Sequence, residues 1–295
     1  MSKLSCWTEA VRLRTLPVSL AGVIAGASMA LCYHTFKPAP VAICLLFATL
    51  AQIASNFANE YFDYRDGLDR KGRTGPRRGV TEGDIPPEAM RNAALATLGC
   101  AAAVGCSLLW WGGWWLIAPG VAIVLGALAY SAGPWPLSRH ALGEIAVVLF
   151  FGVAPVTLTY YLQAGNCPAT VWMTSVAVGL LAANVLIVNN YRDRDDDRAV
   201  GKTTIAVKFG PRFALGLYLA DIIMAVALTL PVWIALCSRG IWILLCPAAW
   251  LVVAVTVWKS VCRSSGTALN PLLGKTAMLM LAYTVMLLLC VTLTL

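Results

Sequence analysis

Residues 171–202, VWMTSVAVGLLAANVLIVNNYRDRDDDRAVGK, decide the fold class. The stretch opens with a long apolar run, about 171–188, and a strongly charged segment follows it directly. A run of this length is enough for an α-helix to cross a hydrocarbon core about 30 Å thick. Because lipid offers no partner for an open backbone N–H or C=O, the run has to be helical. The stretch therefore predicts a membrane-spanning helix that carries a polar site at its end.

Eight further apolar runs of similar length occur in the chain of 295 residues. Hydrophobic residues make up 59% and charged residues 12% of the sequence, and the mean hydropathy is +0.75. Soluble domains average about 45–50% apolar and about 25% charged residues. The composition excludes an ordinary soluble protein, a disordered chain and a coiled coil, and predicts an all-α polytopic membrane protein. Its nine spans are about 16–33, 40–57, 91–110, 114–131, 143–162, 171–188, 213–236, 241–258 and 272–295.

The basic residues set the expected orientation. Of the 22 Lys and Arg residues, 20 fall on one side when the nine spans are threaded alternately, and only Lys37 and Arg239 fall on the other. Basic loops stay on the cytoplasmic side. We therefore expect a multi-pass protein of the cell (inner) membrane with a cytoplasmic N-terminus and an external C-terminus. The net charge of +8 reflects this topology, and no nucleic-acid partner is expected.

Acidic residues gather on the same side. None of the 14 Asp and Glu residues falls in an outer loop. Most lie in two polar segments, 59–88 and 189–212, and each segment begins with Asn and has Asp four residues later. The offset of 130 residues spans four helices. It suggests a single domain, 1–295, with an internal four-helix duplication, about 16–140 and 141–270, and an added ninth helix.

The spacing of the two Asn–Asp pairs places oxygen atoms on shared helix faces. Residues four apart in a helix lie on one face. The first segment therefore aligns an Asn with an Asp, with a second Asp one turn further and a third in the loop beyond Gly67. The second segment forms an i, i+4, i+8 stripe. The candidate metal ligands are Asn59, Asp63, Asp66, Asp69, Asn189, Asp193 and Asp197.

Oxygen ligands without Cys or His favour a hard cation, and Mg²⁺ is the one we expect. Proteins usually hold Mg²⁺ with one or two carboxylates plus substrate phosphates, and basic residues adjoin both acidic segments. A diphosphate bound at a membrane surface, attached to something soluble in lipid, indicates a polyprenyl diphosphate. A GxxxxGK[ST] loop is absent, so nucleotide hydrolysis has no support. The candidate diphosphate-binding residues are Arg73, Arg77, Arg78, Arg198 and Lys202.

Several stretches resemble the UbiA superfamily of intramembrane prenyltransferases, whose members carry acidic motifs of the NDxxDxxxD and DxxxD types. The first motif here has its last acid two positions late, at Asp69, which is typical of the menaquinone branch. It also has Glu60 where the family usually has Asp. The matching stretches are RLRTLPVSLAGVIAG at 12–26, NEYFDYRDGLD at 59–69, RTGPRRGVTEGDI at 73–85, GPWPLSRHALGEIAVVLFFGVAPVTLTYYLQ at 133–163 and NNYRDRDDDRAVGKTTIAVKFG at 189–210.

The resemblance implies nine helices around a central cavity that opens to lipid and cytoplasm, with two Mg²⁺ ions on the diphosphate. The acids that it makes catalytic are Asp63, Asp69, Asp193 and Asp197. The implied reaction joins a polyprenyl chain to 1,4-dihydroxy-2-naphthoate, releases diphosphate and CO₂, and gives demethylmenaquinone for menaquinone biosynthesis. Loss of CO₂ from the attacked carbon restores aromaticity, so a strong general base is unnecessary.

Three residues are candidates for contact with the aromatic acceptor. The resemblance places Arg14, at the inner end of the first span, near the acceptor or the phosphates. Tyr130 lies near the inner end of the fourth span, and Glu144 lies where the fifth begins. Packing is an alternative role for Tyr130, and helix capping is an alternative role for Glu144.

Two other functions stay open. A related prenyltransferase would keep the pocket and use another acceptor, such as 4-hydroxybenzoate, homogentisate, a porphyrin or a glycerol ether. A transporter would use the acids as an ion path, but transporter ion sites usually lie near the bilayer midplane. The acids here are predicted at one membrane face among arginines, which disfavours transport.

Overall fold

The computed structural model describes residues 3–69, 71, 75–131, 133 and 135–295. Within these ranges nine segments are long and apolar enough to cross a membrane, which confirms the predicted number of spans and the all-α class. The first five contain α1 (Lys3–Val11), η1 (Leu13–Thr15) and α2 (Leu16–Cys32); α3 (Pro38–Arg65); α5 (Pro87–Ser107) and α6 (Leu109–Gly112); η2 (Trp114–Leu116) and α7 (Ile117–Ser131); and α8 (Gly143–Val147), the π-helix η4 (Val148–Val153) and α9 (Ala154–Ala164).

The remaining spans and the short connecting helices complete the chain. The last four spans contain α10 (Ala169–Ala199); α12 (Pro211–Leu236); η6 (Ile241–Leu244) and α13 (Leu245–Cys262); and η7 (Gly266–Leu269) and α14 (Asn270–Thr294). The connections carry α4 (Gly79–Glu82), η3 (Leu137–Arg139), α11 (Ile205–Lys208) and η5 (Cys237–Arg239).

Two helices run well past the apolar runs that predicted them. Helix α3 continues to Arg65 and α10 to Ala199, whereas hydropathy placed the ends of these spans near residues 57 and 188. Hydropathy identifies only the part of a helix that lies in lipid. The backbone hydrogen bonds continue into the polar residues beyond it, until a residue with a non-helical φ ends the helix. Gly67 (φ 67°) follows the end of α3 and Gly201 (φ 76°) follows the end of α10. Both Asn–Asp pairs therefore lie on helix and not on loop.

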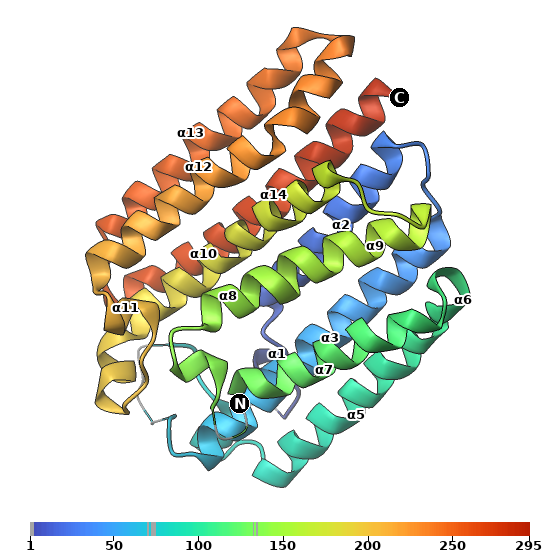
Figure 1. The fold of residues 1–295 in the computed structure, drawn as a ribbon. Coiled ribbons are helices and arrows are strands. Elements are labelled where there is room, and N and C mark those ends of the chain that lie inside the picture. The colour runs from blue at the N-terminus through green and yellow to red at the C-terminus, as the bar shows by residue number, and fades with distance from the viewer. Residues whose placement is uncertain (1–2, 70, 72–74, 132, 134) are drawn as a thin grey trace.

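The helices are arranged in two groups (Figure 1). Helices α10, α12, α13 and α14 lie on one side of the bundle, α3, α5 and α7 on the other, and α2, α8 and α9 between them. The largest apolar core joins α2, α9, α10, α12 and α14, and includes Met29, Tyr160, Trp233 and Tyr283. Helices α5 and α7 lie at the edge of the bundle, where 6% and 17% of their apolar stretches are buried. A cavity lies between α7 and its neighbours.

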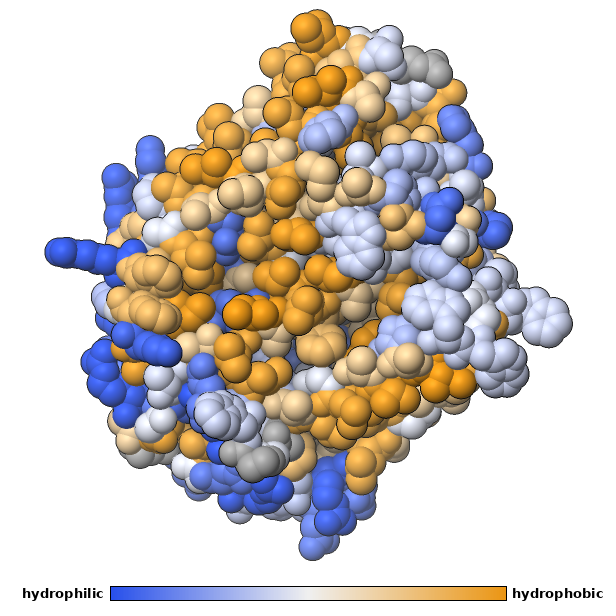
Figure 2. Space-filling model, in the orientation of Figure 1, coloured by the Kyte–Doolittle hydropathy of each residue, from blue (hydrophilic) through white to orange (hydrophobic). Residues whose placement is uncertain are grey.

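The two ends of the bundle differ in chemistry. Four exposed tryptophans gather at the turn between α6 and η2, where Gly113 has a φ of 83°. Indole rings favour the membrane–water interface. The acidic and basic segments lie at the opposite end, which we call the charged end. Figure 2 shows apolar side chains across the middle of one face and hydrophilic ones along its lower left edge. The tryptophans are Trp110, Trp111, Trp114 and Trp115.

Helices α1 and α4 cover part of the charged end. Cys6 and Ala10 of α1 pack with Phe57 of α3 and Val80 of α4 in a second apolar cluster. Glu60, which is 1% exposed, accepts a hydrogen bond from the backbone N–H of Val80 at 3.1 Å. The buried carboxylate therefore holds the loop that contains α4 against the end of α3.

Candidate functional site

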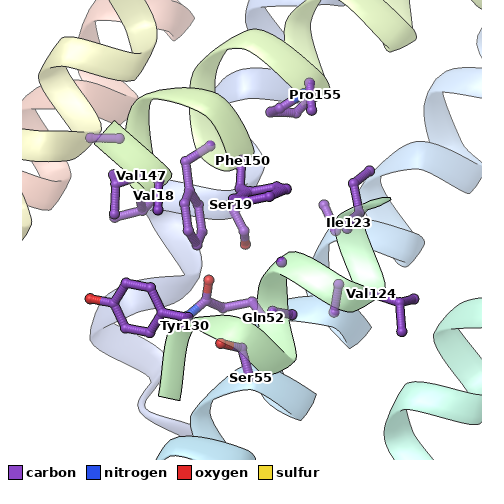
Figure 3. A pocket seen from close by; sticks show the side chains of 18 of the residues that line it. Val18, Ser19, Gln52, Ser55, Ile123, Val124, Tyr130, Val147, Phe150 and Pro155 are labelled. Atoms are coloured by element: carbon purple, nitrogen blue, oxygen red, sulfur yellow. The ribbon is translucent and has the colours of Figure 1, made fainter. Parts of the chain in front are cut away.

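A cavity of about 580 Å³ runs through the bundle between α2, α3, α7, α8, α9 and α10. Its walls are mostly apolar along their length and become polar at the charged end. Figure 3 shows Gln52 and Ser55 of α3, Ser19 of α2 and Tyr130 of α7 around the same space as Phe150 of η4. The cavity therefore offers a long apolar volume that leads to a charged end.

The first acidic motif delivers two of its four candidate ligands to the cavity wall. Asn59 lines the cavity and accepts a short hydrogen bond from Ser131 of α7. Asp63, one turn further along α3, also lines it. An Asp63 oxygen lies 3.8 Å from Arg78 Nη2, and the other lies 3.9 Å from Lys202 Nζ. Two cations from distant parts of the chain therefore face this carboxylate.

The last two acids of the first motif have other surroundings. The backbone N–H groups of Leu68 and Asp69 both lie near the carbonyl oxygen of Asp63, at 2.8 and 3.3 Å, so the turn at Gly67 folds the chain back under α3. Asp69 is buried beside Arg78, with Oδ2 3.3 Å from Nε, and stands behind the cavity wall.

Asp66 lies at the rim of the charged end, outside the cavity wall. It accepts hydrogen bonds from Arg65, at 2.8 Å, and from Arg139. Burial alone would raise the pKa of Asp66, but these hydrogen bonds outweigh it and hold that pKa below its usual value. The structure therefore does not bring Asp66 together with the other candidate ligands.

The second motif delivers all three candidate ligands. Asn189, Asp193 and Asp197 line the cavity from one face of α10, as the i, i+4, i+8 spacing predicts. Asp195 and Asp196 lie off this stripe and are exposed. The two motifs therefore meet across the same cavity.

Lys202 reaches the cavity because the chain reverses after α10. Gly201 adopts a left-handed conformation, and the backbone N–H of Lys202 donates to the carbonyl of Asp197 at 2.9 Å. Thr203 then donates to the carbonyl of Arg139 at 3.0 Å, which ties this turn to the loop after α7. Lys202 Nζ lies 3.9 Å from an oxygen of Asp197 and at the same distance from Asp63. One ammonium therefore bridges the two motifs.

The five basic candidates separate into two groups. Arg78 and Lys202 line the cavity. Arg77 instead forms an ion pair with Asp84 at 2.5 Å, and Arg198, whose side chain is 61% exposed, lies 3.8 Å from Asp195. Each of these two arginines is next in sequence to a residue that lines the cavity, Arg78 or Asp197, and its own side chain therefore points in another direction. Arg73 lies outside the described residues.

The acceptor candidates have mixed positions. Tyr130 lines the cavity. Glu144 is buried, accepts a hydrogen bond from Asn190 Nδ2 at 2.9 Å, and stands behind the wall that Asn190 forms. Arg14 is exposed and lies outside the cavity wall, whereas Arg12 lines it. Arg12 has a φ of 54°, which is uncommon for a residue with a side chain, and a sequence pattern does not predict this turn.

Arg192 is a site residue that the motif spacing missed. It is buried next to Asp193 and donates two hydrogen bonds to that carboxylate, at 2.6 and 2.7 Å. The only signal in the sequence is a difference between the two repeats, since Phe62 stands 130 residues earlier.

The arrangement fits Mg²⁺ held jointly with a phosphate ligand. Among the described residues, no three His, Cys, Asp or Glu side chains come close enough to form a metal cage of their own. Carboxylate and amide oxygens instead line opposite walls of one space. Mg²⁺ is usually bound in this way, through one or two carboxylates and substrate phosphates.

Fold and site together define a class of integral membrane protein in which an apolar cavity between the helices ends among carboxylates and basic side chains. The profile of the UbiA prenyltransferase family matches residues 19–281. The chain belongs to this family of membrane prenyltransferases.

Two curated relatives carry the same name, 1,4-dihydroxy-2-naphthoate octaprenyltransferase. The protein from Escherichia coli is 37% identical over 217 residues, which cover 71% of this chain and 70% of the relative. The protein from Mycobacterium tuberculosis is 31% identical over 291 residues, which cover 96% of this chain and 95% of the relative.

Solved structures share the fold. A UbiA homologue from Archaeoglobus fulgidus superposes with a TM-score of 0.67 at 16% identity, covering 99% of this chain and 100% of that one. Another structure of an A. fulgidus homologue, bound to GPP and Mg²⁺, has a TM-score of 0.62 at 18% identity and covers 94% of this chain and 99% of that one. At these identities the likeness supports the fold alone.

Proposed function

We propose that this protein transfers a polyprenyl group from polyprenyl diphosphate to 1,4-dihydroxy-2-naphthoate, with release of diphosphate and CO₂. The reaction would give demethylmenaquinone for menaquinone biosynthesis. The names of the E. coli and M. tuberculosis relatives support the choice of acceptor. The observation that carries the proposal is the meeting of two Asn–Asp helices, Arg78 and Lys202 at the polar end of one apolar cavity.

The oxygen atoms on the two cavity walls support a site for Mg²⁺, which we propose as two ions. Residues in the cavity wall would hold them, and Asp69 would support the first motif through Arg78. Bound Mg²⁺ would supply charge neutralisation for the leaving diphosphate. The proposed ligands in the wall are Asn59, Asp63, Asn189, Asp193 and Asp197.

Arg78 and Lys202 are suited to hold the diphosphate oxygens. Within the described part of the chain, Arg78 Nε and Nη1 are buried and make no hydrogen bond, although they lie 3.3 Å from an oxygen of Asp69 and 4.0 Å from an oxygen of Glu60. Buried donors without a hydrogen bond are costly, and phosphate oxygens would satisfy them. Lys202 adds a second charge from the opposite wall. Positive groups fixed at this place stabilise the charge that develops on the diphosphate as the allylic C–O bond breaks.

The apolar part of the cavity would hold the start of the prenyl tail and exclude water from the allylic carbon. The side chains that line this part of the cavity, such as Val124, Phe150 and Leu158, are apolar and would pack against the isoprene units next to the diphosphate.

We assign the aromatic acceptor to the region around Tyr130. This hydroxyl group belongs to the same wall as Asn59 and Asp63, near the charged end. Arg12 also lines the cavity, and we place it in the role that the sequence suggested for Arg14. Glu144 would act from behind the wall by orienting Asn190, to which it is hydrogen-bonded.

The charge pattern supports a cytoplasmic charged end and N-terminus, and an external C-terminus, in the cell (inner) membrane. In Figure 1, α1 and the C-terminal end of α14 lie at opposite ends of the bundle, as this topology requires.

The experiment is a direct assay of acceptor choice. Purified protein in lipid vesicles receives Mg²⁺, a polyprenyl diphosphate and one of several aromatic acceptors, and mass spectrometry identifies the product. We expect a prenylated naphthalene product only with 1,4-dihydroxy-2-naphthoate, no product with EDTA, and recovery when Mg²⁺ is restored. Product with 4-hydroxybenzoate or homogentisate alone would overturn the assignment.

A further inference from the structure

Arg192 is a buried cation in which every guanidinium nitrogen donates at least one hydrogen bond. Its side chain is 1% exposed. Nε donates to Asp193 Oδ1 at 2.6 Å, and Nη2 donates to Asp193 Oδ2 at 2.7 Å and to Asn189 Oδ1 at 2.8 Å. Nη1 donates to Asn270 Oδ1 at 3.0 Å. Burying a charge is costly unless the geometry and the hydrogen bonds are good, and here four hydrogen bonds meet one guanidinium.

Two of the three partners are proposed metal ligands. The arginine fork takes one acceptor position on each oxygen of Asp193, and an ionised carboxylate has about four such positions. A planar bidentate pair fixes the plane of the carboxylate as well as its distance. The remaining lone pairs of Asp193 and Asn189 are therefore held in one direction before any ligand arrives.

Asn270 fixes the other edge of the guanidinium. It is the first residue of α14, the ninth span, which follows the two proposed repeats. Helix α14 otherwise contributes only Leu273 to the described cavity wall. The contact between Arg192 and Asn270 therefore links the ninth helix to the second acidic motif.

We propose that Arg192 is a positioning residue that orients Asp193 and Asn189 toward a divalent cation, and that Asn270 holds Arg192 in place. The inference rests on the proposed function, because it takes both residues as metal ligands. Lysine cannot perform this role, since its ammonium is a single point of charge without a planar fork. If Arg192 instead only occupied the place of the metal, replacing it would raise the affinity for the metal. The proposed positioning role predicts that replacing it lowers this affinity.

The test measures metal binding without turnover. Purified full-length protein in detergent is titrated with Mn²⁺ in the presence of inorganic pyrophosphate, and electron paramagnetic resonance reports free Mn²⁺. The variants are Arg192→Lys, Arg192→Gln and Asn270→Ala. The matched control is Arg194→Lys, two residues along the same helix, whose side chain is 24% exposed and lies 3.8 Å from Asp195. Thermal unfolding of each variant verifies that it is folded.

Losing a residue that orients a metal ligand costs about 10–100-fold in metal affinity, and this is the rise in Kd expected for Arg192→Lys and Arg192→Gln. Asn270→Ala removes one hydrogen bond from the guanidinium, and the expected rise is about threefold to tenfold. Arg194→Lys should bind Mn²⁺ like the wild type. A merely structural role for Arg192 would lower the unfolding temperature without this graded change in Kd.

Wild-type affinity in folded Arg192 variants, or tighter binding by Arg192→Gln, would overturn the inference. If neither Arg192 variant folds, Asn270→Ala decides: an unchanged Kd contradicts the proposal. Failure of the wild type to bind Mn²⁺ would remove the proposed metal site and this inference together. Wild-type binding that is indifferent to Arg192 and Asn270 would reject only this inference.

Discussion

The two acidic motifs reach the same cavity by different means. In the second motif, Asn189, Asp193 and Asp197 all lie on one uninterrupted helix, and 72% of an apolar 18-residue stretch of that helix is buried. In the first motif only Asn59 and Asp63 lie on α3 and in the cavity wall, and 39% of the corresponding stretch of α3 is buried.

The cations differ in the same way. The second motif has Arg192 beside Asp193 on α10, whereas the first depends on Arg78 from a loop. Lys202, from beyond α10, faces one carboxylate of each motif. The second motif is therefore preorganised by its own helix and by α14, and the first is completed by the loop between α3 and α5. Two motifs with similar sequence spacing can thus differ in the structural elements that fix their side chains.

The largest expected effect comes from removing one carboxylate in either motif. Asp63→Asn and Asp193→Asn should each lower kcat by about 10²–10³-fold, because each weakens a ligand of the Mg²⁺ that would neutralise the leaving diphosphate. Membrane insertion and folding should be retained. Asp195→Asn, on the exposed side of α10, is the matched control and should stay within about twofold of the wild type. Near-normal turnover by both cavity variants would contradict a catalytic role for either motif.

Removing the loop cation of the first motif should act on substrate binding. Arg78→Gln takes away a donor group whose partner would be charged, so KM for the polyprenyl diphosphate should rise about 10–100-fold. Arg77→Gln, one residue earlier and paired with Asp84, provides the control and should leave KM nearly unchanged. Steady-state kinetics with varied polyprenyl diphosphate distinguishes the two. Equal effects of both substitutions would mean that Arg78 has no special position.

The loop itself is anchored by Glu60. Glu60→Ala leaves the buried N–H of Val80 without its acceptor and should reduce stability by about 1–3 kcal/mol. Glu60→Gln keeps an oxygen at this position and should lose less. Thermal unfolding in detergent reports the stability, and limited proteolysis between α3 and α5 reports the loop. If Glu60→Ala is as stable and as resistant as the wild type, the loop is held by other contacts.

The smallest effect concerns Asp66, which pairs with Arg65 and Arg139 at the rim. Because its pKa is lowered in the folded protein, the pairing stabilises the fold above the ordinary Asp pKa of about 3.9 and is lost as pH falls through the lower folded value. Asp66→Asn should cost less than about 1 kcal/mol at neutral pH, and the difference should vanish at strongly acidic pH. A difference that grows on acidification would contradict this assignment.

Composition and hydropathy were sufficient for the nine spans and the all-α class, because each apolar run satisfies the length that lipid demands. The i, i+4, i+8 spacing also predicted the stripe Asn189, Asp193 and Asp197, since a helix face is a local property. The positions of residues that follow a turn could not be predicted from helix spacing. Asp69 and Lys202 reach their places through glycines at positive φ, and Arg12 through its own left-handed conformation.

The sequence also does not predict which carboxylate each arginine contacts. Arg77 and Arg78 are neighbours, yet one pairs with Asp84 at the surface and the other lines the cavity. Arg192 looks like any charged residue after an apolar run, and only its contacts with Asp193 and Asn270 reveal its setting. Which arginine meets which carboxylate depends on tertiary packing, which local spacing does not encode.

The central claim is that both motifs bind the same diphosphate through divalent ions. Electron paramagnetic resonance of Mn²⁺ bound to the protein with an inert prenyl thiodiphosphate tests it most directly. The account predicts metal binding that depends on the diphosphate, with two ions in the wild type and fewer in Asp63→Asn and in Asp193→Asn alike. Unchanged Mn²⁺ binding in either variant, or binding that ignores the diphosphate, would contradict a shared site.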